Sequence, residues 1–305
     1  MILSSQEIRE WRETIDTSLL KRSEEIIDNI VSKYPKARRV WDQLRNDSFL
    51  SAQWDLSDYI AVIKMGYNAH GDIHAKIVTA NALKMLDLLL EAGLQPDIVK
   101  ASEETSESRN PVESGDVDDA HLIILLSGLL HDIGNQVNRS NHNLHSEILA
   151  RPILDKVLTA IYPDERKKGI IRGFILHCIY THMEDTPSYT IEASLVKVAD
   201  GTDMTKGRGR IPFEMGNVNI NCVSAMSIGE VEIVKGREKP IGIKINMTNS
   251  AGIFQVEEIL YKKLVAGVTG KYVEITAQTV PEKPFMDERI VYKITVEKDK
   301  FVHTR

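Results

Sequence analysis

Hydrophobic positions recur at helical spacing over the first two thirds of the chain. Ser4 and Glu7 form a capping-box pattern, and apolar residues then follow every three or four positions. The same period predicts further helices at about 70–92, 119–132, 143–160, 164–182 and 190–204. The stretch that contains Pro35, Trp41 and Trp54 is predicted to be rich in loops. These segments together predict an all-helical domain.

The pattern changes near Met215 to an alternation of apolar and polar residues, which is typical of half-buried strands. Alternating runs lie around Val231 and Ile233, over 241–247, over 271–280 and over 289–297, and a helical stripe (Ile253, Val256, Leu260, Leu264) separates the second run from the third. The order predicts a small α+β domain (strand-strand-helix-strand-strand) over 215–305, after a helical domain over 1–214. One helix covers only one face of such a sheet, so the other face is expected to meet a second chain or the helical domain.

Residues 95–119 interrupt the helical pattern with eight acidic and two basic residues and no aromatic residue. This composition predicts a mobile surface insertion within the helical domain. Two interpretations stay open for it: a solvated insertion without function, or an active-site flap or docking segment.

Composition narrows the class of protein. The chain has 305 residues, 42% of them hydrophobic, and a formal net charge of −6, which disfavours a general nucleic-acid binder. Two cysteines make neither a disulfide scaffold nor a site of four thiolates. The start lacks the pattern of a secretion signal, and the most apolar stretch, Leu122 to Leu130, is about half the length that spans a bilayer. We expect a soluble cytoplasmic protein with no membrane and no nucleic-acid partner.

Eight of the nine histidines fall between residues 70 and 182. The pair His131-Asp132, in SGLLHDIGN, ends a strongly apolar helix. A carboxylate buried there needs a partner, and a cation is the obvious one. The alternative is that Asp132 and Gly134 only end the helix, with Asp132 in solvent.

Four further segments put this pair in context: His74 in GDIHAKIV, His145 in HNLHSEILA, His182 in CIYTHMED and Asp200 in VKVADGTDM. Each lies on or beside a predicted helix. This ordered set, spread over residues 70–205, resembles the HD superfamily of metal-dependent phosphohydrolases. The pattern of that family is a His, the HD pair, one to three further His and a final Asp.

The resemblance implies roles for these residues. His74, His131, Asp132 and Asp200 match the core metal ligands, and His145 and His182 would complete a second metal site that Asp132 bridges. Asp132, His145 and His182 are thereby expected to serve catalysis. The cofactor is expected to be one or two divalent ions, with Mn, Mg, Fe, Co and Ni all open.

The other histidines are weighed against these. His177 lies about 140° around a helix from His182, so the two do not share a site, and His182 fits the family pattern better. His145 is preferred to His142 because it fits the family pattern better. His142 is expected to contact a ligand residue or the substrate. His70 is expected at a helix start or on the surface, whereas His121 and His303 are expected to be structural.

Basic residues provide candidates for binding phosphate. Lys206, Arg208 and Arg210 follow the last ligand among glycines, and Arg139 follows the HD pair. The alternative for the basic run is a solvated or salt-bridged linker into the second domain. Asp203 is expected to orient a ligand histidine or to pair with this run.

The resemblance implies hydrolysis of a phosphate ester, of a nucleotide or a related small phosphorylated metabolite, by a metal-activated hydroxide. A di-iron oxygenase and a non-catalytic nucleotide-binding sensor or scaffold are the alternatives. The tail is expected to act as a dimerisation or regulatory module, which makes a homodimer the expected assembly.

Overall fold

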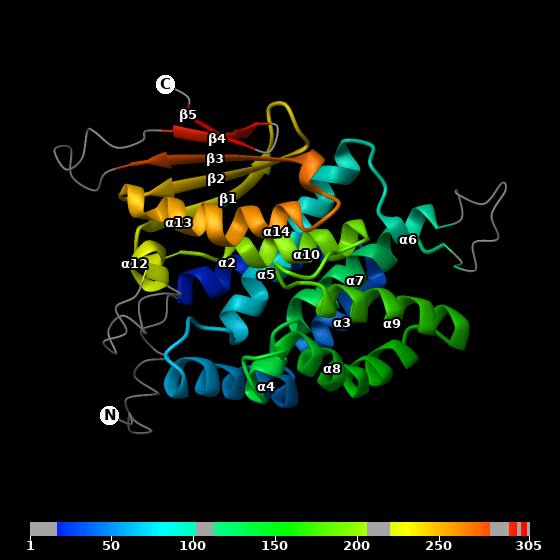
Figure 1. The fold of residues 1–305 in the computed structure, drawn as a ribbon. Coiled ribbons are helices and arrows are strands. Elements are labelled where there is room, and N and C mark those ends of the chain that lie inside the picture. Colours follow the sequence, from blue (N-terminus) through cyan, green and yellow to red (C-terminus); the bar gives the residue numbers. More distant parts are fainter. Residues whose placement is uncertain are drawn as a thin grey trace.

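The computed structural model describes residues 17–101, 112, 114–205, 220–280, 293–297 and 300–303. Helices make up the larger part, and a sheet lies on one side of them (Figure 1). In the described residues, no helix combines the length and apolar character needed to cross a bilayer. The expected capping box at Ser4 lies outside the described residues.

The first described helices include a segment that the sequence had suggested to be loops. They are α2 (Thr17–Val31), α3 (Pro35–Leu44), α4 (Ser48–Asp58) and η1 (Tyr59–Lys64). The loop prediction is wrong because Pro35 begins α3, where its missing N–H costs nothing. Trp41 and Trp54 are buried in the core, and the Trp54 indole donates to the carbonyl of Leu129 at 3.0 Å.

The predicted helices of the central part form within a few residues of their expected limits. They are α5 (Asp72–Glu91), α7 (Val117–Leu130), α8 (His142–Thr159), α9 (Glu165–Tyr180) and α10 (Ile191–Thr202), with the short η2 (Ile133–Gln136) after α7. Residues 119–130 of α7 are all buried, so α7 is the centre around which the others pack. A Cβ on Gly128 would lie 2.4 Å from Oγ1 of Thr79, which shows how closely α5 and α7 approach.

The acidic insertion is ordered where it begins. Residues Asp97–Lys100 form the short helix α6, and Ile98 is fully buried. The Glu192 carboxylate of α10 accepts hydrogen bonds from the backbone N–H of Ile98 (2.9 Å) and of Asp97 (3.3 Å). Residues 97–100 and 117–119 of the insertion are thus helical and not loop, residues 102–111 and 113 lie outside the described part, and the mobility of the insertion stays a prediction.

The tail has the predicted α+β character, with one strand more than expected. Its elements are α12 (Ile220–Met226), β1 (Ile228–Lys235), β2 (Ile241–Met247), η3 (Ser250–Gly252), α13 (Ile253–Gln255), η4 (Val256–Tyr261), α14 (Lys262–Val265), η5 (Gly270–Tyr272), β3 (Val273–Thr279), β4 (Lys293–Glu297) and β5 (Lys300–His303). The strand order is β1-β2-β3-β4-β5, and only β2 and β3 pair in parallel. The expected fold class, a helical domain with a small α+β part, is confirmed.

The sheet packs on the helical part through one face. Ile241, Ile243 and Ile245 of β2 are buried, whereas Lys244 between them is exposed. Helix α14 lies between the sheet and α10 (Figure 1). The Ser194 hydroxyl of α10 bonds that of Thr269 at 2.6 Å, so the tail is fixed directly to the helix that carries Asp200.

Candidate metal centre

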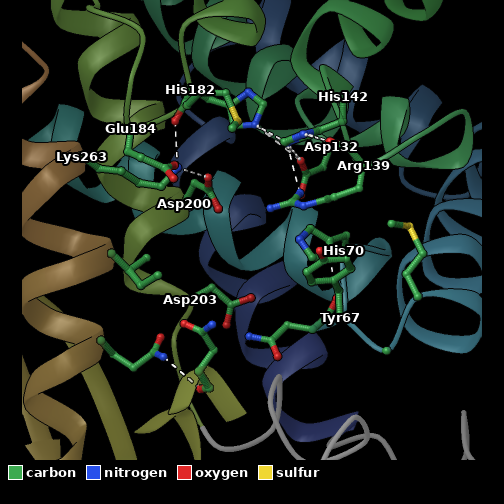
Figure 2. A pocket seen from close by; sticks show the side chains of 17 residues that line it. Tyr67, His70, Asp132, Arg139, His142, His182, Glu184, Asp200, Asp203 and Lys263 are labelled. Atoms are coloured by element: carbon green, nitrogen blue, oxygen red, sulfur yellow. Dashed lines mark hydrogen bonds and ion pairs between the residues drawn. The ribbon is translucent and has the colours of Figure 1, made fainter. Parts of the chain in front are cut away.

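Six polar side chains converge at the ends of separate helices (Figure 2 labels four of them). His74 lies in the first turn of α5, His131 and Asp132 follow α7, His142 begins α8, His182 follows α9, and Asp200 lies in the last turn of α10. All six are at least nine-tenths buried. Helix ends suit this purpose because neighbouring residues there can point at one centre, which 3.6 residues per turn prevents in mid-helix.

Each of the four histidines donates its Nδ1–H to an oxygen. The acceptors are the Gly128 carbonyl for His131 (2.9 Å), the Arg139 carbonyl for His142 (2.9 Å), the Ile179 carbonyl for His182 (2.6 Å) and Oδ2 of Asp203 for His74 (2.7 Å). A ring that donates from Nδ1 keeps its lone pair at Nε2. Histidines that bind metals are oriented in this way. Of the two roles expected for Asp203, the structure shows the orientation of a ligand histidine.

The four Nε2 atoms point into two groups. Nε2 of His74 lies 3.1 Å from Nε2 of His131, and Nε2 of His142 lies 3.1 Å from Nε2 of His182. Two lone pairs at that distance repel each other unless a cation lies between or beside them. The donor set itself therefore calls for positive charge at both places.

Asp132 belongs to both groups. Its Oδ2 lies 3.2 Å from Nε2 of His74 and its Oδ1 lies 3.1 Å from Nε2 of His142. Asp200 joins one group only, with Oδ1 at 3.3 Å from Nε2 of His74. We name these the inner group (His74, His131, Asp132, Asp200) and the outer group (Asp132, His142, His182).

Electrostatics keep these side chains in the states that bind metal. Burial lowers the pKa of His131 to about 3, so its ring is neutral at pH 7. Burial alone would raise the pKa of Asp132, but the imidazoles around it hold that pKa well below its ordinary value. Burial would also raise the pKa of Asp200, but Lys263, His74 and His131 together hold that pKa well below its ordinary value. Neutral imidazoles and ionised carboxylates are ligands for divalent first-row metals.

The donor set fits one or two divalent ions. In the described residues, ligand atoms of His74, His131 and Asp132 lie within 4.8 Å of one another, and so do those of Asp132, His142 and His182. The shared carboxylate offers one oxygen to each group. The residues present therefore fit a pair of ions that would share Asp132.

A cavity of about 390 Å³ opens onto the centre. Asp132, His142, His182 and Asp200 line it from the centre, whereas His74 and His131 do not. Its size suits a small-molecule ligand. The Arg139 guanidinium also lines it and lies 3.2 Å from Nε2 of His142, which brings a fixed positive charge beside the outer group.

Local packing explains why the HD segment adopts this shape. A Cβ on Gly134 would lie 2.1 Å from the carbonyl oxygen of His142, so only glycine lets η2 lie against the start of α8. The N–H of Gly134 donates to Oγ of Ser146 at 2.8 Å. Asn141 has a φ of 58°, a left-handed conformation that Asn tolerates, and α8 begins at the next residue. These contacts fix His142 opposite Asp132.

The structure brings together five of the six residues expected to bind metal: His74, His131, Asp132, His182 and Asp200. It does not bring His145 to either group, and His142 takes that position instead. His145 lies one turn further along α8, half-buried, and its Nδ1 has no hydrogen-bond partner in the described residues. Helix spacing alone could not choose between two histidines three residues apart.

Only some of the residues expected to bind phosphate lie in the described part of the chain. Arg139 lines the cavity, whereas Lys206, Arg208 and Arg210 lie outside the described residues. His177 accepts the N–H of Tyr189 at 3.3 Å and belongs to neither group of ligand atoms.

Two residues at the site were missed by the sequence analysis. His70, expected at a helix start or on the surface, is buried and lines the cavity. The backbone N–H of His70 donates to Oδ1 of Asp58 at 2.7 Å, which draws the loop before α5 inward. Lys263 comes from the tail, where no motif pointed to it. For His70, the signal in the sequence was its position one turn before His74. For Lys263, we found no signal in the sequence.

Comparisons with known proteins agree with this geometry. A family model described as "HD domain" matches residues 80–205, which hold His131, Asp132, His142, His182 and Asp200 but begin after His74. "Uncharacterized protein MJ1020" of Methanocaldococcus jannaschii is 41% identical over 251 residues, which are 82% of this chain and 92% of that protein. No solved structure matches the chain. The chain belongs to the HD-domain superfamily.

Proposed function

We propose that this protein is a metal-dependent phosphohydrolase that cleaves a phosphate ester of a nucleotide or a related small phosphorylated metabolite. The observation that carries the proposal is the convergence of four anchored imidazoles on the two oxygens of Asp132, beside a cavity lined by Arg139. Membership of the HD-domain superfamily supports the reaction class.

The inner group would hold one divalent ion and the outer group the other, with Asp132 shared. Such ions supply a water of lowered pKa as nucleophile and neutralise charge on the phosphoryl oxygens. His74, His131, His142 and His182 are kept in the metal-binding tautomer by their Nδ1 acceptors, and that is their share of the chemistry. The protein then contributes positioning and electrostatics, which suffice for phosphoryl transfer.

Arg139 would bind the substrate. Its Nη1 donates to Oδ1 of Asn135 at 3.1 Å, so the guanidinium is held in place while it lines the cavity. A guanidinium offers paired N–H donors that match two phosphate oxygens. The cytoplasmic location and the homodimer stay predictions of the sequence.

The test is a panel of phosphorylated substrates assayed for phosphate release with Mn, Mg, Fe, Co and Ni in turn. We expect metal-dependent release that is lost in Asp132→Asn and kept in His177→Asn, a matched control outside both groups. Consumption of O₂ by an iron-loaded protein that releases no phosphate would contradict the proposal and favour an oxygenase.

A further inference from the structure

A lysine of the tail reaches the metal centre. Lys263 is the second residue of α14 and is 6% exposed. Its Nζ donates to Oδ2 of Asp200 at 2.6 Å and to the carbonyl oxygen of His182 at 2.8 Å. Figure 2 shows both bonds. The tail thus contacts one residue of each group of ligand atoms.

The two oxygens of Asp200 have different partners. Oδ1 faces Nε2 of His74 at 3.3 Å, within the inner group, whereas Oδ2 faces Lys263. The Lys263 ammonium therefore does not occupy the point on which the ligand atoms of the inner group converge. An ion in the inner group and the charge of Lys263 are compatible.

The packing of α14 on α10 fixes the side chain of Lys263. A Cβ on Gly201 would lie 3.1 Å from Cδ of Lys263 and 3.2 Å from Cδ1 of Leu260, so the lysine stem lies closely against α10. A buried ammonium is costly unless its donors are used. Two of its three N–H donors bind the acceptors above, and the residue lines the cavity. Among the described residues, these two acceptors leave the third donor of Lys263 for a group that enters the cavity.

We propose that Lys263 binds the phosphoryl group of the substrate, so that the α+β tail supplies one wall of the active site. This inference rests on the proposed function for the identity of the anion. Lys263 lies beside Asp200, whereas Arg139 lies beside Asp132 and His142 (Figure 2), so a phosphate bound between the two cations would meet both. Gln255 and Asn221 of the tail line the same cavity.

The test measures binding of inorganic phosphate to the metal-loaded full-length protein by titration calorimetry, with metal content measured in parallel. Lys263→Met is expected to weaken phosphate binding by about 10- to 100-fold, because a hydrogen bond to a charged group is lost. Lys263→Arg keeps the charge and is expected to restore most of the affinity. The control is Lys262→Met, because Lys262 is the adjacent lysine and pairs with Glu258 on the surface. Phosphate binding by Lys263→Met equal to that of the wild type overturns the proposal.

A second measurement needs no variant and decides the question if Lys263→Met does not fold or load metal. Hydrogen exchange of the metal-loaded wild type is compared with and without inorganic phosphate. Slower exchange over 256–265 supports contact with the tail, and unchanged exchange there overturns it. If the protein binds phosphate through Lys263 but hydrolyses no phosphate ester, the result contradicts the proposed function and agrees with this inference.

Discussion

The inner and outer groups of ligand atoms share Asp132 but differ in composition and surroundings. The inner group adds two histidines and Asp200, whereas the outer group adds His142 and His182 only. The outer histidines line the cavity beside Arg139, and the inner histidines do not. More carboxylate and less access favour tight retention of an inner ion, so the outer position is the one expected to exchange its ion and to meet substrate.

The variant with the largest expected effect removes what the two groups share. Asp132→Ala leaves both groups without their common carboxylate, so both ions should be lost and activity should fall by at least about 10²- to 10³-fold. Metal content by plasma mass spectrometry and phosphate release measure this. A variant that keeps two ions and its activity would refute the bridged arrangement.

The next prediction distinguishes the inner group from the outer group by removing a ligand of the outer group alone. His142→Ala should lose the outer ion and keep the inner one, whereas the matched variant His145→Ala should keep both. The reason is that Nε2 of His142 lies 3.1 Å from Oδ1 of Asp132, and His145 belongs to neither group. Metal stoichiometry decides, and the reverse result would restore His145 as the ligand.

A smaller effect is expected from Asp203, which orients His74 of the inner group. Asp203→Asn weakens the 2.7 Å acceptor that holds Nδ1 of His74, and such partners are worth about 10- to 100-fold in metal affinity. Competition with a chelator measures the affinity of the inner ion, with exposed Asp185→Asn as control. Equal loss from both groups would show that Asp203 does not act through His74 alone.

The smallest effect on the metal centre is expected for the last prediction, which concerns the stability of the fold away from both groups of ligand atoms. Burial raises the pKa of Glu192 to about 7, so between its ordinary value and pH 7 the folded state binds more protons than the unfolded state. The free energy of unfolding should therefore fall as the pH rises through this window, by about 2–3 kcal/mol. Thermal denaturation of the apoprotein at pH 5 and pH 8 checks this. Glu192→Gln should remove that dependence, and an unchanged slope would place its origin elsewhere.

Sequence periodicity was sufficient for the helices that carry the ligands, because their apolar positions are long and regular. It failed at Pro35, since a proline that begins a helix has the same local signature as one that ends a helix. It also failed to choose His142 over His145, because that choice depends on where Asn141 turns the chain.

Lys263 shows a different limit. The stripe Ile253, Val256, Leu260, Leu264 predicted the buried face of its helix, and Leu264 is buried as expected. No spacing in the tail indicated that Lys263 faces Asp200, which lies 63 residues earlier in the chain. Contacts between distant segments follow from packing, and a single sequence carries no local pattern for them.

Three of the four imidazoles take their orientation from the main chain. His131, His142 and His182 each donate to the carbonyl of the residue three positions earlier, whatever side chain that residue carries. A substitution at position 179, for example, leaves the acceptor of the His182 ring in place. A metal centre with this construction keeps the orientation of its ligands while side chains around it change, so the walls of the cavity can diverge among related proteins without loss of the ligand geometry.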